Sequence, residues 1–524
     1  MHRSSFPDVD IPDVSVYDYL FGDLEESRLD AVAIVDGTSG AETSYRQLIG
    51  QIDLFAGALA ARGVGVGTTI GLLCPNIPAF ATVFHGILRS GATATTINSL
   101  YTPEEIANQL VDAEATWLVT VSPLLAGAKA AAEKLGMDAD HVIVLDGAEG
   151  HPSLPALLGE GRGAPEVAFD PATHLAVLPY SSGTTGRPKG VMLTHRNLVA
   201  NVAQCRPVLS VDETDRLLAV LPFFHIYGMT VLLNFALRQR ASLVTMPKFD
   251  LPEFLRIISE HRTTWVFVAP PIAVALAKHP IIDQYDLSAV DVIFSGAAPL
   301  DGALAAAVAN RLGCTVVQGY GMTETSPAVT LIPAERHDVD KSSIGPLVPN
   351  TEARLVDPES GADVPASADG VSAPGELWVR GPQVMSGYLN RPEATAEMRD
   401  ADGWLHTGDV ATVSADGIFR IVDRLKELIK YKGYQVAPAV LEAVLLEHPA
   451  IADAAVIGAL DSDGQEVPKA FVVVQQGAEI DADAVMAHVT AKVAPHEKVR
   501  QVEFIDAIPK SAAGKILRKD LRAR

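Results

Sequence analysis

Short apolar runs alternate with helical patterns from about residue 30 to residue 385, and this alternation restricts the possible folds more than any other feature of the chain. The run at 69–74 precedes a helical pattern at 79–88, and the run at 265–268 precedes one at 271–277. Parallel strands need crossover helices of this kind, which then cover both faces of the sheet. The pattern therefore predicts an α/β fold with parallel-rich sheets flanked by helices.

Two later regions break the pattern. Around residues 355–388 the apolar runs become shorter and β-like, as at 376–379, and Gly, Asp, Ser and Pro separate them. After Asp423, a charged stretch leads into a compact α+β pattern, with a helix near 438–447 and a strand near 454–457. We predict a large N-terminal domain (1–423) with two sheets and a β-rich subdomain at about 350–423, and a small mobile α+β C-terminal domain (424–524).

Charge and cysteine content exclude several classes of function. The formal net charge of −23 and the lack of a basic block disfavour nucleic acid and anionic membranes as partners. The three cysteines are widely spaced, which fits a cytoplasmic protein without disulfides or a zinc site. Uncharged stretches at 63–88 and 217–237 are broken by Gly, Pro and His, so we expect no stable membrane insertion. The oligomeric state stays open between monomer and homodimer.

The strongest local signal is the run YSSGTTGRPKG at residues 180–190, which follows an apolar run at 175–178. Glycines let backbone N–H groups approach oxygens, hydroxyls add donors, and a lysine supplies charge for a β- or γ-phosphate. Read alone, the run could equally be a flexible Ser/Gly linker, but the strand before it favours a phosphate-binding loop. It lacks the spacing of a Walker A loop. The candidate residues are Ser181, Ser182, Gly183, Thr184, Thr185 and Lys189.

Four further segments follow in order: QGYGMTE at 318–324, WLHTGD at 404–409, DRLKELIKYKG at 423–433 and PKSAAGKI at 509–516. Together with the phosphate loop, they resemble the adenylate-forming superfamily of acyl-CoA ligases, adenylation domains and luciferases. The resemblance implies ATP, Mg²⁺ and coenzyme A as cofactors and a small carboxylic acid as substrate. It adds Gln318, Gly319, Thr323, Asp409, Arg424 and Lys515 to the ATP/AMP-binding residues and Glu324 as the Mg²⁺ ligand.

The same resemblance implies two catalytic orientations of the C-terminal domain. Lys515 would bridge the acid and the α-phosphate during adenylation, and the segment from Lys430 to Gln435 would serve thioester formation. The hinge would be Arg424, Leu425 and Lys426, a charged stretch that can stay solvated in both states. Lys248, Lys432 and Gly433 match positions that bind CoA.

Within the superfamily, the chain most resembles 4-coumarate–CoA ligases, which implies 4-coumarate and related cinnamic acids as substrates. The expected acyl pocket comprises His225, Tyr227, Val231, Gly296, Ala297, Gly319, Gly321, Pro327 and Ala328. We expect Tyr227 to stack on a substrate ring for which Gly296 leaves room. Phe294 stands where the plant enzymes usually have lysine, and Ala328 where valine is common. Both differences suit a less hydroxylated or bulkier acid.

Other functions remain open at this stage. A medium-chain fatty acyl-CoA ligase and a stand-alone enzyme that loads a carrier protein would share the first half-reaction. A luciferase-like oxygenase shares the motifs, and a non-catalytic nucleotide sensor would bind ATP without releasing pyrophosphate. The presence of both Lys430 and Lys515 argues against the sensor.

Overall fold

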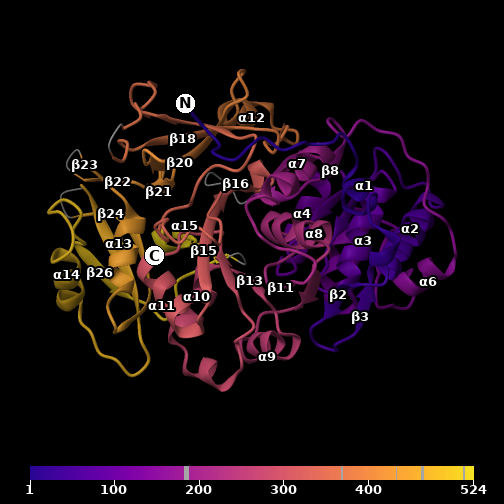
Figure 1. The fold of residues 1–524 in the computed structure, drawn as a ribbon, viewed down its shortest axis with the longest axis horizontal. Helices are drawn as coiled ribbons and strands as arrows, with labels where there is room; N and C mark the ends of the chain where they lie inside the picture. The colour runs from indigo at the N-terminus through magenta and orange to yellow at the C-terminus, as the bar shows by residue number, and fades with distance from the viewer. Residues whose placement is uncertain (182–187, 368–369, 432–433, 462–464, 512–513) are drawn as a thin grey trace.

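Two large mixed sheets build the N-terminal part of the protein in the computed structural model, which describes residues 1–181, 188–367, 370–431, 434–461, 465–511 and 514–524 (Figure 1). The first sheet has the strand order β19 (Gly387–Tyr388), β10 (Lys189–Thr194), β8 (Leu175–Val177), β5 (Thr93–Thr96), β4 (Thr69–Leu72), β6 (Trp117–Thr120) and β7 (Val142–Val144), with β9 (Tyr180–Ser181) paired to β10. The second has the order β16 (Ala328–Leu331), β15 (Thr315–Gly321), β14 (Val292–Ser295), β13 (Trp265–Val268), β11 (Arg216–Ala219), β12 (Ser242–Thr245), β2 (Val32–Asp36) and β3 (Glu42–Ser44).

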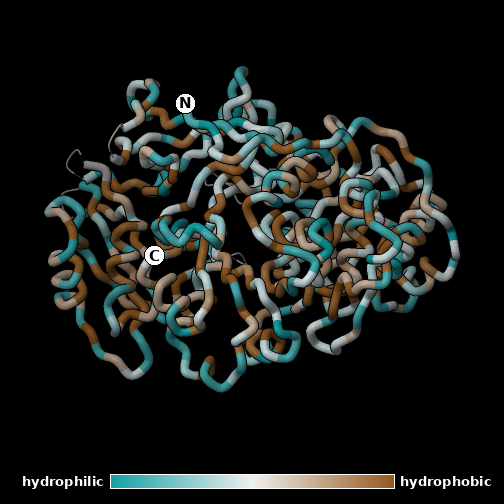
Figure 2. Tube along the Cα trace, in the orientation of Figure 1, coloured by the Kyte–Doolittle hydropathy of each residue, from teal (hydrophilic) through white to brown (hydrophobic). Residues whose placement is uncertain are grey.

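The central strands of both sheets are parallel, as the alternating pattern predicts, and antiparallel strands lie at the edges. The largest apolar core joins the two sheets through helices that contact both, and separate cores cover their outer faces. Figure 2 shows the brown, hydrophobic segments gathered along these internal strands and helices.

The α-helices are α1 (Val16–Phe21), α2 (Tyr45–Ala60), α3 (Pro78–Arg89), α4 (Pro103–Asp112), α5 (Leu125–Lys134), α6 (Leu154–Gly159), α7 (His195–Cys205), α8 (Phe235–Gln239), α9 (Leu251–His261), α10 (Pro270–Lys278), α11 (Gly302–Leu312), α12 (Pro392–Met398), α13 (Pro438–Leu446), α14 (Ala482–Thr490) and α15 (Arg518–Arg522).

Shorter helical turns occur at η1 (Glu26–Arg28), η2 (Ser122–Leu124), η3 (Ala139–His141), η5 (Pro280–Gln284) and η6 (Thr323–Thr325), and η4 (Tyr227–Asn234) is a π-helix. The start of α4 shows how local sequence sets these boundaries. Thr102 and Glu105 form the capping box that their spacing predicts: the Glu105 N–H donates to the Thr102 hydroxyl, and the Thr102 N–H donates to the Glu105 carboxylate. A capped start fixes where α4 begins, and therefore which of its residues face the interior.

The β-rich subdomain is an antiparallel sheet with the order β1 (His2–Arg3), β17 (Glu352–Val356), β18 (Gly375–Arg380), β20 (Leu405–Val413) and β21 (Phe419–Arg424). It lies at the top of Figure 1, where β1 at the N-terminus pairs with β17. The sequence pattern did not predict this pairing.

The C-terminal part has hydrophobic cores of its own, between Ile429 and Leu521. These cores involve two small sheets, β22 (Ile429–Tyr431) with β23 (Tyr434–Val436), and β24 (Ile451–Leu460) with β25 (Glu466–Val474) and β26 (Gln501–Phe504). In Figure 1 this part lies at the left, beside α10, α11 and β15. The small α+β unit is therefore present, and the exact boundary at 423/424 stays a prediction.

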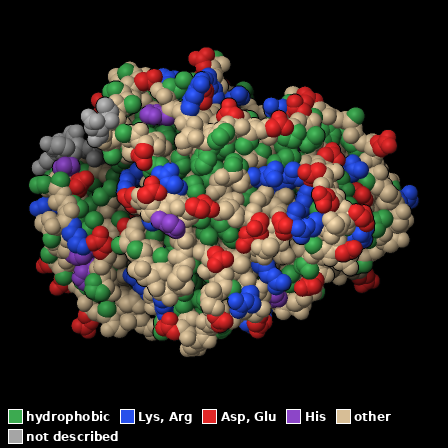
Figure 3. Space-filling view, in the orientation of Figure 1, with side chains coloured by type: hydrophobic (Ala, Val, Ile, Leu, Met, Phe, Trp, Pro, Cys, Tyr) green, Lys and Arg blue, Asp and Glu red, His purple; other side chains and the backbone are tan. Residues whose placement is uncertain are grey.

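Three observations bear on the excluded functions. Within the described residues, no helix is long and apolar enough to cross a membrane. Cys74, Cys205 and Cys314 are free thiols. Acidic and basic side chains are interspersed over the face seen in Figure 3. The cytoplasmic location expected from the sequence stays a prediction.

Candidate active site

A cavity of about 730 Å³ lies where the central strands of the second sheet end, between the N-terminal part, the β-rich subdomain and the C-terminal part. Ligands of open α/β sheets bind at the carboxyl ends of parallel strands, where loops diverge and leave a crevice. β5, β14 and β15 all direct their carboxyl ends here, through Thr96, Gly296 and Gly321. The C-terminal part closes the cavity with Ser511, Lys515 and Leu517.

The end of β15 runs directly into η6, and this short path delivers Thr323 and Glu324 to the cavity. Glycine is required along the strand because neighbouring backbone comes very close. A Cβ on Gly319 would lie 2.6 Å from the carbonyl oxygen of Thr330, and one on Gly321 would lie 2.1 Å from that of Pro327. The two glycines therefore serve the close pairing of β15 with the chain that follows it.

Glu324 is almost fully buried, with 5% of its surface exposed, yet it lines the cavity. Its Oε1 accepts hydrogen bonds from the Ser181 hydroxyl at 2.9 Å and the Tyr388 hydroxyl at 2.7 Å. Within the described part of the chain, both donors use the same oxygen, which leaves Oε2 for a ligand. Mg²⁺ commonly takes one or two protein carboxylates and fills its other positions with water and substrate phosphates, so Glu324 fits the role of a Mg²⁺ ligand.

Asp409 projects from β20 into the cavity and is held from both sides. The Tyr320 hydroxyl donates to its Oδ2 at 2.5 Å, and Nε of Arg424 lies 3.3 Å from its Oδ1. Its own N–H donates to the Thr407 hydroxyl. A fixed carboxylate at a cavity wall is well suited to accept hydrogen bonds from a pair of hydroxyls, as on a ribose.

Lys515 stands at the cavity end of a turn in which its N–H donates to the Ser511 hydroxyl. Burial lowers the pKa of Lys515 to about 8, and the positive charge of Arg424 acts in the same direction against the raising effect of Asp409 and Glu324. A partly desolvated cation is a strong partner for an anion that enters the same space.

The other end of the cavity is an apolar slot beside η4. The Tyr227 ring packs over Gly296, where a Cβ would lie 2.7 Å from its Cε1, and Phe294 and Phe267 approach its edge. The room at Gly296 is thus filled by Tyr227 itself, whereas the sequence suggested that it was left for substrate. The wall of the slot also includes Val231, Ala297, Pro327, Ala328 and Leu331.

His225 lies between the slot and the C-terminal part, close enough to Lys515 for their charges to interact. Burial and, to a lesser extent, the nearby positive charge of Lys515 together lower the pKa of His225 to about 4. Nδ1 of His225 accepts a hydrogen bond from the Tyr227 N–H at 3.3 Å. The imidazole is therefore neutral at pH 7.

The structure brings most of the predicted site residues into one cavity; this group comprises Ser181, Lys189, His225, Tyr227, Val231, Gly296, Ala297, Gly319, Gly321, Thr323, Glu324, Pro327, Ala328, Asp409, Arg424, Leu425, Lys426 and Lys515. Gln318 is not among them, because its buried side chain bonds the backbone of Leu300 and Lys341. Lys248 and Lys430 are exposed and do not line it. Gln435 pairs opposite Lys430 across β22 and β23, and its side chain is not described. Ser182, Gly183, Thr184, Thr185, Lys432 and Gly433 lie outside the described residues.

Several lining residues were not predicted as site residues. Tyr320 and Tyr388 orient the two key carboxylates, and Glu105 and Gln109 reach the cavity from α4. Tyr320 lies inside the QGYGMTE segment, so the motif contained a signal for it. The residues on α4 carried none, because their approach depends on the packing of distant elements.

The chain belongs to the AMP-binding enzyme family: residues 23–389 match the family "AMP-binding enzyme" and residues 440–515 match the "AMP-binding enzyme C-terminal domain". It is 43% identical over 533 residues to 4-coumarate–CoA ligase 5 of Oryza sativa subsp. japonica, with 100% of this chain and 97% of that protein covered. Among solved structures, the anthranilate CoA ligase AuaEII in complex with anthranoyl-AMP has a TM-score of 0.89 and 28% identity, with 98% of each chain covered. ATP-bound MatB from Rhodopseudomonas palustris has a TM-score of 0.88 and 29% identity, with 98% of this chain and 99% of that chain covered.

Proposed function

We propose that this protein is an ATP-dependent carboxylic acid–CoA ligase that acts on 4-coumarate and other hydroxycinnamic or cinnamic acids. In the first step the acid and ATP give acyl-AMP and pyrophosphate, and in the second step acyl-AMP and CoA give acyl-CoA and AMP. The observation that carries the proposal is the single cavity in which Lys515, Glu324 and Asp409 face an apolar slot. CoA in the name of the rice relative and ATP in the MatB structure support the same reaction.

Adenylation needs the carboxylate oxygen placed in line with the bond from the α-phosphorus to pyrophosphate. Asp409 would accept the ribose hydroxyls, supported by Arg424, and Thr323 would donate to the α-phosphate. Lys515 would lie between the α-phosphate and the attacking carboxylate, where its charge offsets their mutual repulsion. Its partial desolvation strengthens that contact, because the attraction between charges rises as water is excluded.

Glu324 and the phosphate oxygens would hold Mg²⁺, which would neutralise charge on the triphosphate. Lys189 would assist from the edge of the phosphate loop; its Nζ lies 4.9 Å from the centre of the Tyr388 ring. The loop residues Ser182, Gly183, Thr184 and Thr185 complete the proposed nucleotide site.

Thioester formation would need a second orientation of the C-terminal part, because Lys515 lines the cavity in this structure and Lys430 does not. We propose that residues 424–524 turn about Arg424, Leu425 and Lys426, so that Lys515 leaves and the strand pair carrying Lys430 and Gln435 approaches. The exposure of Lys430 in this structure fits a residue that is used only after that turn. Lys248, Lys432 and Gly433 would then contact CoA.

The slot favours a flat apolar acid. Its walls are aromatic and aliphatic and include Tyr227 and Phe294, whose rings contact each other, and Phe294 is 2% exposed. Phe294 offers no hydrogen bond to a ring hydroxyl, so we expect unsubstituted cinnamate to be used about as well as 4-coumarate. The same apolar walls keep a medium-chain fatty acid as a second candidate, since an acyl chain needs apolar contact alone.

The test measures pyrophosphate release and CoA-thioester formation with ATP and Mg²⁺ over cinnamic, benzoic and C6–C16 fatty acids. Leading kcat/KM values for the cinnamic acids would support the proposal. Leading values for fatty acids would keep the chemistry and reject the substrate class. Adenylate formation without thioester would instead point to loading of a carrier protein.

A further inference from the structure

The phosphate hairpin, defined here as β9 together with the first two residues of β10, is anchored at its base through Asp112 and Arg391, which do not line the cavity. Lys189 pairs with Ser181 and Gly190 pairs with Tyr180, so the ladder closes the segment directly at the proposed phosphate loop. A Cβ on Gly190 would lie 3.1 Å from the Tyr180 ring, so that ring lies against the opposite strand. Any tilt of Tyr180 would therefore move the base of the loop.

Neighbouring residues of a strand point to opposite faces, and the two residues of β9 are held by two different carboxylates. On the cavity side, Ser181 donates to Glu324. Tyr180 also lines the cavity, and its hydroxyl donates at 2.8 Å to Oδ2 of Asp112, which does not line it. Oδ1 of Asp112 in turn accepts from Nη2 of Arg391 at 2.8 Å, so each oxygen of this carboxylate has one donor.

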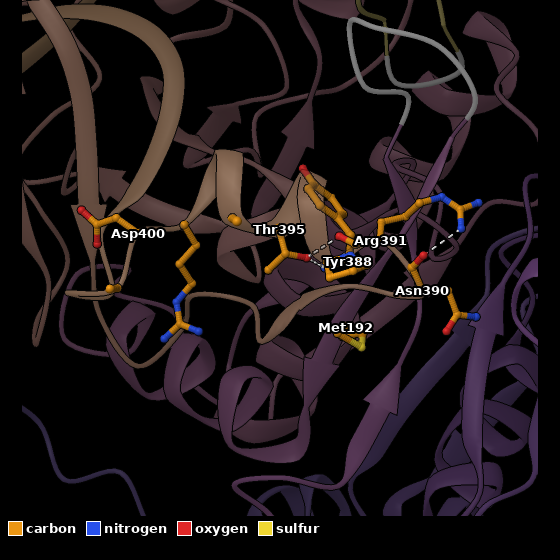
Figure 4. A pocket seen from close by; sticks show the side chains of 10 residues that line it. Met192, Tyr388, Asn390, Arg391, Thr395 and Asp400 are labelled. Atoms are coloured by element: carbon orange, nitrogen blue, oxygen red, sulfur yellow. Dashed lines mark hydrogen bonds between the residues drawn. The ribbon is translucent and has the colours of Figure 1, made fainter.

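Asp112, the partner of Tyr180, and Arg391, the partner of Asp112, are both held by structure of their own. Asp112 is the last residue of α4, the capped helix that brings Glu105 and Gln109 to the cavity. Arg391 lies in the turn between β19 and α12, beside a surface recess of about 610 Å³ shown in Figure 4. The Thr395 hydroxyl closes this turn by accepting from the Tyr388 N–H and donating to the Arg391 carbonyl. Nη1 of Arg391 also donates to the Asn390 carbonyl, as Figure 4 shows.

We propose that Asp112 and Arg391 are positioning residues for the adenylation step, which act through the Tyr180 hydroxyl to fix the phosphate hairpin. The inference rests on the proposed function, in which this hairpin binds the β- and γ-phosphates. Fixed donors bind the triphosphate without having to be ordered first, so the relay of Tyr180, Asp112 and Arg391 lowers the cost of binding ATP. The pyrophosphate leaves after the first step, so the relay has no role in thioester formation.

The chain contains a matched control. The Tyr17 hydroxyl donates to Oδ1 of Asp53 at 3.0 Å, and Nε of Arg89 lies 3.3 Å from the same oxygen. These residues belong to α1, α2 and α3, and they do not line the cavity. Tyr17→Phe and Asp53→Asn therefore remove the same kinds of contact from the same combination of side chains elsewhere in the fold.

The experiment compares the two half-reactions in the full-length protein for Tyr180→Phe, Asp112→Asn, the double variant and the two controls. The first half is followed as pyrophosphate release at varied ATP, and the second as thioester formation from synthetic 4-coumaroyl-AMP and CoA. We expect Asp112→Asn to lower kcat/KM for ATP by about 10-fold or more and Tyr180→Phe by about 3- to 10-fold, since bonds to a charged group are among the stronger ones. The rate of thioester formation should stay within about twofold of wild type, because the pyrophosphate has left before this step and the relay has no role in it. The double variant should be no worse than Asp112→Asn, because both changes remove one contact.

Several outcomes would overturn the inference. Equal losses in both half-reactions would show general damage, and equal losses in the Tyr17→Phe and Asp53→Asn controls would show the same. Unchanged ATP kinetics would also reject it. If Asp112→Asn does not fold, Tyr180→Phe alone decides, because it removes a single hydroxyl. If wild type releases no pyrophosphate with any acid, the proposed function fails, and equilibrium dialysis of ATP still tests whether Tyr180→Phe weakens binding more than Tyr17→Phe.

Discussion

The charge of Lys515 should set the upper pH limit of adenylation. With a pKa of about 8 in the free enzyme, about 90% of Lys515 is protonated at pH 7 and about 10% at pH 9. Only the protonated side chain can hold the α-phosphate and the carboxylate together. Because kcat/KM reports the free enzyme, we expect kcat/KM for adenylation to fall about 10-fold between pH 7 and pH 9. Under saturating substrates the decline should move to higher pH, since bound anions favour the charged form.

The assay is pyrophosphate release at substrate concentrations well below KM, measured in steps of half a pH unit. The matched variant is Lys515→Arg, whose guanidinium stays charged throughout this range. Its absolute rate should be lower, because a planar group replaces a point charge, and the decline above pH 8 should disappear. A wild-type profile that is flat to pH 9.5, or the same decline in Lys515→Arg, would refute the assignment of this limb to Lys515.

Three other changes test separate parts of the cavity. Gly296→Ala should raise KM for the acid about 10-fold and leave KM for ATP unchanged, because the new Cβ would displace the Tyr227 ring. Steady-state kinetics measure both KM values, and the control is Gly50→Ala, where a Cβ meets nothing within 4 Å. Asp409→Asn should weaken ATP binding about 10- to 100-fold and reduce the preference for ATP over 2′-deoxy-ATP, as measured by calorimetry; an undiminished preference would contradict the ribose contact. Lys515→Met should raise the free energy of unfolding at pH 7 by up to about 3 kcal/mol. The pKa of Lys515 is about 8 in the folded state and near 10.4 in the unfolded state. Burial of the charged side chain therefore destabilises the wild-type fold, and this destabilisation is complete below pH 8. The gain should vanish as pH rises toward about 10.4, and a gain that does not depend on pH would contradict the electrostatic cause.

The sequence predicted strands and motifs well where one local rule decides the outcome. The strand at 265–268 is where the pattern predicted it, and α4 begins where the spacing of Thr102 and Glu105 allows a capping box, because periodicity and capping are properties of neighbouring residues. The pairing of His2 and Arg3 with the sheet of the β-rich subdomain depends on contacts some 350 positions apart, which no local pattern encodes.

The same distinction holds in the candidate site. Motifs identified Glu324, Asp409 and Lys515, which lie in one cavity. They did not identify Tyr388 or Asp112, whose roles come from a turn and a helix end that pack against the motif residues. Nor did the motifs show that the Gln318 side chain hydrogen-bonds the backbone of Leu300 and Lys341 instead of facing the cavity, because these two residues lie outside the motif.

The ion pairs of the C-terminal part suggest how it can turn as a body. Among its described residues, the ion pairs Lys469–Glu503, Lys492–Glu447, Lys510–Asp453, Arg518–Glu442 and Arg522–Glu427 lie wholly within it. The rotation about Arg424 to Lys426 that we propose would preserve these pairs and change contacts with the N-terminal part, including those of Lys515 at the cavity. While ATP and a carboxylate are bound, their negative charge stabilises the lysine there. Once pyrophosphate leaves, most of that charge is gone and the cost of burying Lys515 remains, so we expect release of pyrophosphate itself to favour the turn toward thioester formation.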